Sequence, residues 1–406
     1  MKKTPKGSRL HIAIFGRRNV GKSSLLNCLT LQDASIVSSF PGTTTDPVEK
    51  PMELLPIGPV LFIDTAGLDD QGRLGQLRIE KSSRIFDRAD IILLITEAWV
   101  WTDFEEVILE EAGKRNTPIL VILNKIDIQK SGRSLTANLD KKSIPYLDLS
   151  CLDKNWELTA RVKNKIVDIL PDYWTNSLPL ISDLIEQNDQ VILVIPIDKQ
   201  APRGRLILPQ QQTIREILDK KATCLITDEQ NLASVLNNLK KRPKLVVCDS
   251  QVFKEVSDVV PRDIPVTSFS ILFARSKGDL EEFIKGVEAV DSLNPGDRVL
   301  IAEACTHHPI GDDIGRVKIP RWIGQKRGYK IEFDVYSGHD FPNDLDSYKL
   351  IIHCGSCMLN RKETLSRIYQ AKSQHLAITN YGIIIAYLHQ GLERGIEVFR
   401  QQENRA

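Results

Sequence analysis

The stretch Gly16-Arg17-Arg18-Asn19-Val20-Gly21-Lys22-Ser23 decides the fold of the N-terminal part of this chain. It fits the pattern G-x-x-x-x-G-K-[ST] and lies between a strand-like segment, Leu10 to Phe15, and a helix-like segment, Ser23 to Leu31. Glycines let backbone N–H groups close around phosphate oxygens, and the helix start adds its positive dipole end. We therefore predict a phosphate-binding loop in which Lys22 reaches the β- and γ-phosphates and Ser23 ligates Mg²⁺.

Three further motifs follow in the order that a guanine-nucleotide site requires. We expect Asp64 of Asp64-Thr65-Ala66-Gly67 to hold magnesium through water, and the Gly67 amide to sense the γ-phosphate. In Asn124-Lys125-Ile126-Asp127 the Asp127 carboxylate accepts from the N1 and N2 groups of guanine, a donor pair that adenine lacks. Ser150-Cys151 lies where a loop usually supports guanine O6. Between the phosphate-binding loop and Asp64, the segment Pro41-Gly42-Thr43-Thr44-Thr45-Asp46 offers Thr44 to magnesium.

Together these motifs predict a site for GTP or GDP with Mg²⁺. Catalytic roles are expected for Lys22, Thr44 and Gly67, and magnesium contacts for Ser23, Thr44 and Asp64. The expected nucleotide-binding residues are Gly16, Asn19, Val20, Gly21, Lys22, Ser23, Ser24, Thr44, Asp64, Gly67, Asn124, Lys125, Asp127, Ser150 and Cys151.

Over about residues 8–170 the motif set resembles the Era/TrmE-like translation-factor-class GTPases. Position 68 is Leu and not the glutamine that positions water in Ras-like enzymes, so intrinsic turnover should be slow. Asn19 resembles the asparagine that in this class helps to bind K⁺ against the phosphates, where the cation does the work of an arginine finger. The alternative for Asn19 is a loop residue without a ligand role.

Strand-like and helix-like segments alternate along the whole chain, which predicts an α/β protein with parallel sheets. Pro171 to Pro179 is interpreted as a linker. We expect an N-terminal P-loop GTPase domain, a small doubly wound middle domain and a C-terminal α/β domain, at residues 1–172, 173–270 and 271–406. In the last of these, Ile383 to Phe399 is expected to form one helix.

Cysteines and histidines gather at two expected strand ends in the last quarter of the chain, Cys305-Thr306-His307 and His353-Cys354-Gly355-Ser356-Cys357. The C-x-x-C spacing lets two thiolates meet one metal centre, with Gly355 easing the turn. Three thiolates fit a 4Fe-4S cluster that leaves one iron to a non-cysteine ligand. Three cysteines and a histidine equally fit structural zinc, and free buried cysteines are a third interpretation. His307, His353 and Asp312 are candidates for the fourth ligand, and the two histidines alternatively support the ligands.

The order of a GTPase domain followed by Cys305-x-His307 and His353-Cys354-x-x-Cys357 resembles the HydF family of iron–iron hydrogenase maturation GTPases, and residues 201–210 resemble that family's middle domain. The resemblance covers essentially the whole chain. It implies a dimerisation domain in the middle, a C-terminal 4Fe-4S domain held by Cys305, Cys354 and Cys357, and a homodimer or higher oligomer. It also implies a scaffold that receives a di-iron precursor from two radical-SAM maturases and passes it to the apo iron–iron hydrogenase.

Composition limits the other possibilities. Lys and Arg total 54 and Asp and Glu 53, a net charge of +1, so no nucleic-acid partner is expected. No apolar run is long enough to span a bilayer and the basic start lacks the apolar stretch of a secretory signal, which favours the cytoplasm and no membrane partner. The alternative function is an Era/TrmE-like GTPase with a zinc module that acts in ribosome or tRNA processes, and the near-zero charge counts against it.

Overall fold

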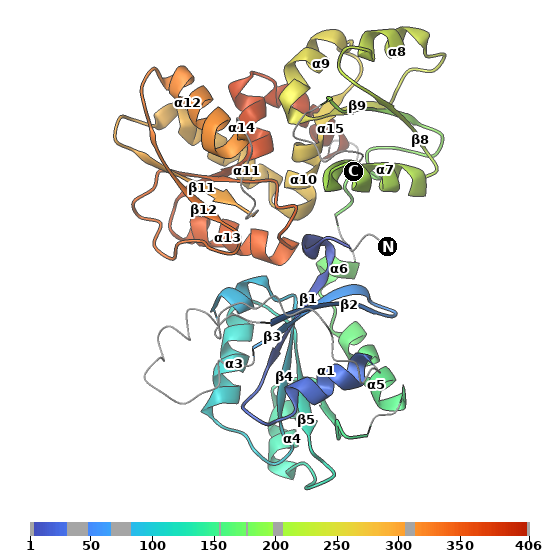
Figure 1. Cartoon of the computed structure of the whole chain (residues 1–406), viewed down its shortest axis with the longest axis vertical. Helices are drawn as coiled ribbons and strands as arrows, with labels where there is room; N and C mark the ends of the chain where they lie inside the picture. The colour runs from blue at the N-terminus through green and yellow to red at the C-terminus, as the bar shows by residue number, and fades with distance from the viewer. Residues whose placement is uncertain are drawn as a thin grey trace. The chain divides into compact units, whose positions relative to one another are not determined.

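The computed structural model describes residues 4–30, 48–65, 83–153, 156–175, 178–197, 206–304 and 313–403. The chain divides into two compact units, Met1–Ser177 and Leu178–Ala406, and each is built on parallel strands covered by helices (Figure 1). This confirms the α/β fold that the alternation of segments predicts.

In the first unit, the strands of the described ranges form one sheet, whose central strands are buried on both faces. Every residue of β1 (Leu10–Phe15) is buried, and so are all of β4 (Ile91–Glu97) except the last. Such continuous apolar runs are typical of parallel strands that have helices on both sides. β2 pairs antiparallel with β3, and the other pairings are parallel. The strand order is β2 (Val48–Leu54), β3 (Gly58–Asp64), β1, β4, β5 (Ile119–Asn124) and β6 (Tyr146–Asp148).

Helices cover both faces of this sheet (Figure 1). One buried cluster joins Leu25 of α1 and Val162 of α5 to the sheet, and a second, on the other face, contains Ile108 of α3 and Leu139 of α4. The helices are α1 (Lys22–Thr30), α3 (Asp103–Lys114), α4 (Arg133–Lys141), α5 (Trp156–Asp168) and the short α6 (Asp172–Thr175), with a 3₁₀ turn η1 (Lys6–Ser8).

The described residues of the second unit form two four-stranded parallel sheets. The first has the order β10 (Val266–Ser268), β9 (Leu245–Cys248), β7 (Gln190–Val194) and β8 (Thr223–Thr227). The second has the order β12 (Glu332–Ser337), β11 (Arg298–Glu303), β13 (Leu350–His353) and β14 (Ala377–Asn380).

One hydrophobic core runs through both of these sheets. It contains Leu193 of the first sheet, Phe269 and Leu272 of α10, and Ile301 and Ile351 of the second sheet. The helices are α7 (Leu208–Asp219), α8 (Leu232–Asn238), α9 (Phe253–Val259), α10 (Phe269–Lys277), α11 (Leu280–Val287), α12 (Ile319–Arg327), α13 (Arg361–Ser373), α14 (Tyr381–Leu388) and α15 (Leu392–Glu403), with short turns η2 (Ser250–Val252), η3 (Glu288–Ser292) and η4 (Ile314–Lys318).

The last helix of the chain returns to the first sheet of this unit. The Thr267 hydroxyl of β10 donates to the Gly395 carbonyl of α15 at 2.8 Å, and Arg394 of α15 donates to the Val260 carbonyl at 2.7 Å. The two domain boundaries expected from the sequence, at 172/173 and 270/271, stay a prediction. α15 lies in the last expected domain and packs against β10, which lies in the middle one.

One expectation about local structure needs correction, and a second gains a detail. The prediction of a single helix from Ile383 to Phe399 is wrong, because a turn at Gln390 and Gly391 separates α14 from α15. Gln390 takes a left-handed conformation with φ +59°, and the Cβ that any other residue would add at Gly391 lies 2.6 Å from the ring of Phe253. The segment interpreted as a linker, Pro171 to Pro179, contains the division between the two units after Ser177, and it also contains the short helix α6.

None of the helices in the described ranges is long and apolar enough to cross a membrane.

The close approach of α11 to β14 yields a test of this packing. A Cβ at Gly286 would lie 1.9 Å from the Ile378 carbonyl oxygen, so Gly286→Ala must push helix and strand apart. We expect a loss of about 1–3 kcal/mol, or roughly 2–4 °C in Tm per kcal/mol. Calorimetry with saturating GDP separates the transition of the second unit, because nucleotide shifts only the unit that binds it.

Gly324→Ala is the matched control, because it also lies inside a helix but its added Cβ meets no atom closer than 3.5 Å. A Gly286→Ala protein that unfolds no earlier than the control would contradict the packing.

Candidate functional site

The phosphate-binding loop follows β1 and requires glycine at two positions. A Cβ at Gly16 would lie 2.4 Å from the Ile95 carbonyl oxygen of β4. Gly21 has φ +107°, and its Cβ would lie 2.3 Å from Nδ2 of Asn124. The two glycines therefore let the loop pass between the neighbouring strand ends.

The loop holds its lysine against its own carbonyl groups. The buried Lys22 ammonium donates to the carbonyls of Gly16 and Arg17, the latter at 2.9 Å. Ser23 is exposed and Ser24 half-buried at the start of α1, and Asp64 is buried at the carboxyl end of β3. The predicted residues Thr44 and Gly67 lie outside the described residues.

An ion pair that the sequence motifs do not indicate joins this loop to α3. Arg17 Nε donates to Glu105 Oε1 at 2.8 Å, and its Nη2 donates to the Thr96 hydroxyl at 3.1 Å. Glu105 is fully buried and also accepts from the backbone N–H and hydroxyl of Thr102, which precedes α3. The spacing of Thr102 and Glu105 is the signature of a capping box and marks this helix start in the sequence.

At the base end of the site, Asn124 joins three segments. Its Nδ2 donates to the Val20 carbonyl at 2.7 Å, and its Oδ1 accepts from the Cys151 N–H at 2.9 Å. Lys125, with φ +66°, pairs with Glu97 at 2.6 Å. Asp127 is exposed, so its carboxylate is accessible to a ligand.

The loop after β6 is buried beside Asn124. Ser150 and Cys151 are both buried, and the Ser150 hydroxyl accepts from the Leu152 N–H at 3.3 Å. Burial raises the pKa of the Cys151 thiol to about 12, so it stays protonated and neutral. The first unit thus brings together the described part of the predicted nucleotide site at the carboxyl ends of its strands.

In the second unit, the ends of β11 and β13 bring the cysteine segments together. Ala302 and His353 are register partners, and the Cys354 N–H donates to the Ala302 carbonyl at 2.9 Å. The Ala304 N–H in turn lies 3.0 Å from Cys354 Sγ. Cys305, His307 and Asp312 lie outside the described residues. Within the part of the chain that is described, no three Cys, His, Asp or Glu side chains form a metal-binding group.

The turn between Cys354 and Cys357 differs from expectation in one respect. Its left-handed residue is Ser356, with φ +55°, and not Gly355. The Ser356 backbone N–H bonds to the sulfur of Cys354, as does that of Ala304, and both hydrogen bonds oppose the rise in the pKa of this thiol that burial causes, to about 11. Amide hydrogen bonds to sulfur are among the interactions that tune iron–sulfur sites.

His353 is fully buried and supports this turn. Its Nδ1 lies 2.9 Å from the Cys354 carbonyl oxygen, so Nδ1 carries the proton, and its Nε2 accepts from Arg367 at 3.2 Å. Burial and the Arg367 charge lower the pKa of His353 to about 3, so the ring is neutral. Both ring nitrogens thus contact protein groups, which fits the supporting role better than that of a metal ligand.

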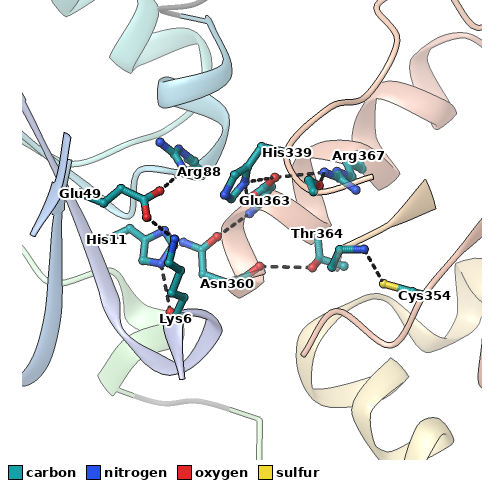
Figure 2. A network of polar contacts seen from close by, with 12 residues as sticks. Lys6, His11, Glu49, Arg88, His339, Cys354, Asn360, Glu363, Thr364 and Arg367 are labelled. Atoms are coloured by element: carbon teal, nitrogen blue, oxygen red, sulfur yellow. Dashed lines mark hydrogen bonds and ion pairs between the residues drawn. The ribbon is translucent and has the colours of Figure 1, made fainter. Parts of the chain in front are cut away.

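A buried polar network continues from this histidine. Arg367 pairs with Glu363 at 3.1 Å, and Glu363 lies 3.0 Å from Nδ1 of His339, as Figure 2 shows. The Asn360 side chain accepts from the Glu363 N–H at 3.1 Å and begins α13. Neither Arg367 nor Glu363 stands out in the sequence, because both belong to an otherwise polar helix.

Lys277, at the end of α10, also contacts the cysteine turn. Its Nζ donates to the Ser356 carbonyl at 3.1 Å and to the Leu359 carbonyl at 2.9 Å. Burial lowers the pKa of Lys277 to about 8, against the opposing influence of Cys357 and Cys354. No sequence motif marks this lysine.

A P-loop followed by an asparagine and aspartate pair, both at the ends of parallel strands, defines the first unit as a GTPase domain. Comparison with known proteins agrees. Residues 11–125 match the family model of the 50S ribosome-binding GTPase. Residues 180–278 match the hydrogen maturase F dimerization domain, and residues 281–398 match the hydrogen maturase F tetramerization domain. The chain belongs to the HydF family of hydrogenase maturation GTPases, in which an N-terminal GTPase domain precedes two oligomerisation domains.

Individual relatives resemble only part of the chain. The tRNA modification GTPase MnmE of Trichodesmium erythraeum is 42% identical over 120 residues, which are 29% of this chain and 25% of that protein. MnmE of a Synechococcus species is 42% identical over 122 residues, with the same coverage of 29% and 25%. The chain thus spans about a quarter of the length of the curated relatives it matches. A crystal structure of Aquifex aeolicus Era bound to GDP.AlF4- is 21% identical, with a TM-score of 0.33 over 56% of this chain and 97% of that one.

These matches confirm the family, the GTPase domain with its GTP, GDP and Mg²⁺, and the dimerisation domain in the middle of the chain. The C-terminal match describes tetramerization, which supports an oligomer larger than a dimer. The roles of single residues in both sites stay predictions.

Asn124 offers a test of the nucleotide site that does not depend on its touching the base. Asn124→Ala removes two buried hydrogen bonds worth about 1–1.5 kcal/mol each, and this predicts a loss of roughly ten- to hundredfold in GDP affinity. Titration with a fluorescent GDP analogue measures it. Asn138→Ala, on the exposed side of α4, is the control and should bind as the wild type does. Equal affinities for both variants would contradict the bridging role.

Proposed function

We propose that this member of the HydF family is a GTP-hydrolysing scaffold. It binds a 4Fe-4S cluster, receives a di-iron precursor from two radical-SAM maturases and transfers it to the apo iron–iron hydrogenase, in the cytoplasm. The observation that carries the proposal is the meeting of β11 and β13, where the Ala304 amide bonds to Cys354 Sγ at 3.0 Å. The tRNA activity in the name of the MnmE relatives is not carried over, because those matches cover 29% of this chain.

The donor set at this strand edge fits an iron–sulfur cluster. Cys354 and Cys357 supply two thiols across a turn, and two backbone amides bond to the sulfur of Cys354, where they stabilise a thiolate. Cys305 directly follows Ala304 in the sequence and is proposed as the third ligand. When bound, a cluster with three cysteine ligands supplies one iron whose fourth ligand is exchangeable, and His307 and Asp312 remain candidates for that ligand. His353 is proposed to hold the turn through the Cys354 carbonyl.

On the nucleotide side, each proposed role follows from position. Lys22 leaves the loop carbonyls for the β- and γ-phosphate oxygens, which are stronger acceptors because they are charged. The exposed Ser23 hydroxyl and the Asp64 carboxylate serve Mg²⁺, together with Thr44, and the Gly67 amide contacts the γ-phosphate. Asp127 reads guanine, while Asn124 fixes the loops that flank it.

Potassium is proposed as an activator because position 68 holds Leu where Ras-like enzymes have a catalytic glutamine. Asn19 is exposed and has φ +62°. Asparagine tolerates this conformation better than most residues. An asparagine at position 19 is therefore explained either by this backbone conformation or by an amide oxygen that binds K⁺, and the experiment separates the two explanations.

GTP turnover should be several-fold faster in KCl than in NaCl. Asn19→Gly keeps the positive φ and removes only the amide, so it should hydrolyse GTP at the sodium rate in both salts, with Lys22→Ala as the inactive background. Phosphate release measures all three. A wild type with equal rates in the two salts, or an Asn19→Gly protein that still responds to potassium, would sink the potassium site.

Replacing Cys305, Cys354 or Cys357 by Ser should remove most of the cluster iron and all hydrogenase maturation, because each change deletes one proposed thiolate. GTP hydrolysis should persist, since the nucleotide motifs lie in the other unit. Iron analysis, the colour of the anaerobic protein and activation of apo-hydrogenase after loading by the two maturases are the measurements. A brown wild type indicates iron–sulfur, and a colourless one zinc.

Cys224→Ser is the matched control. This thiol is half-buried like Cys354 and Cys357 but lies on β8 of the other sheet, so the variant should keep its iron. A Cys354→Ser protein with full iron and full maturation activity would refute the cluster assignment.

A further inference from the structure

Lys277 is a half-buried lysine at the end of α10, and it contacts the Cys354–Cys357 turn. The function proposed above gives this lysine no role. Its Nζ donates to the Ser356 carbonyl at 3.1 Å and to the Leu359 carbonyl at 2.9 Å. Ser356 lies between the two cysteines, and the buried Leu359 follows them. One ammonium group thus bonds to the turn and to the segment that leaves it.

A basic residue in the last turn of a helix usually interacts with the carbonyls of its own helix end. Lys277 instead reaches carbonyls of a segment about 80 residues further along the chain, as the separations of 79 and 82 show. Its Nζ also lies 5.8 Å from the ring centroid of Phe273, one turn earlier in α10. The ammonium is therefore placed by the tertiary structure at the cysteine turn.

A positive charge near this site would stabilise the proposed cluster. Three thiolates make a cluster site anionic, reduction adds a further electron, and the low dielectric of a protein interior strengthens the effect of a nearby charge. Arg367, which bonds to His353 beside this turn, is already paired with the buried carboxylate of Glu363. Lys277 comes before the turn in the sequence, whereas Arg367 comes after it, and the Lys277 ammonium bonds to the backbone carbonyls of Ser356 and Leu359.

We propose that Lys277 is a positioning residue for the iron–sulfur site: it fixes the Cys354–Cys357 turn through two carbonyls and supplies a positive charge that favours the reduced cluster. This inference rests on the proposed cluster. It assigns the cluster a partner outside the C-terminal region, because Lys277 belongs to residues 180–278, which match the dimerization domain, whereas Ser356 and Leu359 belong to residues 281–398.

The test uses the full-length protein, reconstituted anaerobically, as wild type, Lys277→Met and Lys277→Arg. Lys277→Met keeps most of the apolar stem but loses charge and donors. It should move the midpoint potential of the cluster to more negative values and release iron to a chelator several-fold faster than the wild type. Lys277→Arg keeps the charge and should return the potential toward the wild-type value. Redox titration followed by EPR gives the potentials.

Lys220→Met is the matched control, because it removes the same charge from an exposed position at the end of α7, beside the other sheet. It should leave potential and iron release unchanged. Lys277→Met could fold, with the circular dichroism of the wild type, and still take up no iron. The midpoint potential is then measured on Lys277→Gln, which keeps a hydrogen-bond donor without the charge.

The outcomes separate the two proposals. A wild type with a 4Fe-4S signal and a Lys277→Met protein of identical potential would overturn the role of Lys277 and leave the cluster standing. A wild type without iron would overturn both. A shift shared equally by Lys220→Met would also refute the proposal, because the effect would then be one of net charge.

Discussion

The parallel register of neighbouring strands is the constraint on which both sites depend. Parallel strands end at the same edge of a sheet, and loops at that edge converge. In the first unit this places the loop after β1, Asp64 at the end of β3 and Asn124 at the end of β5 together. In the second, pairing of Ala302 with His353 brings the Ala304 amide to the Cys354 sulfur. A slip of one residue would turn every side chain of the strand to the other face, and the amide would no longer meet the sulfur.

Local chemistry explains what the sequence predicted well. The phosphate-binding loop is a contiguous motif, and its two glycines lie where a Cβ would clash with Ile95 or Asn124. The glycine positions of the motif are therefore those that the structure requires. The central strands are apolar runs and were recognisable for the same reason. β2 was missed because it is a charged, largely exposed edge strand, held by Glu49, which pairs with Arg88 at 2.7 Å and with Lys6. The end of α14 before α15 was missed because its cause is a distant contact. The ring of Phe253, more than a hundred positions earlier in the chain, leaves no room for a Cβ at position 391.

The cysteine site shows where pattern reasoning stops. The C-x-x-C spacing identified the two thiols, but the pattern is equally compatible with His353 as ligand or as support. The supporting role is favoured by Arg367 of α13, which donates to Nε2 of His353. Likewise the left-handed position of the turn fell on Ser356, whose backbone amide bonds to Cys354, and not on the glycine that the composition of the turn suggested. Contacts of this kind are made by backbone atoms and by residues without a motif, and only the tertiary structure identifies them.

The continuous core of the second unit bears on how the family's two oligomerisation regions relate to the cysteine site. Phe269 and Leu272 of α10 pack in the same core as Ile301 and Ile351, so the helix that ends at Lys277 is held by both sheets. α15 returns from the second sheet to β10 of the first, where Thr267 bonds to the Gly395 carbonyl. A movement of the first sheet against the second must therefore displace α10 or break buried contacts. Because α10 carries the ammonium that bonds to the Cys354–Cys357 turn, the position of the cysteines depends on the packing of the region that matches the dimerization domain.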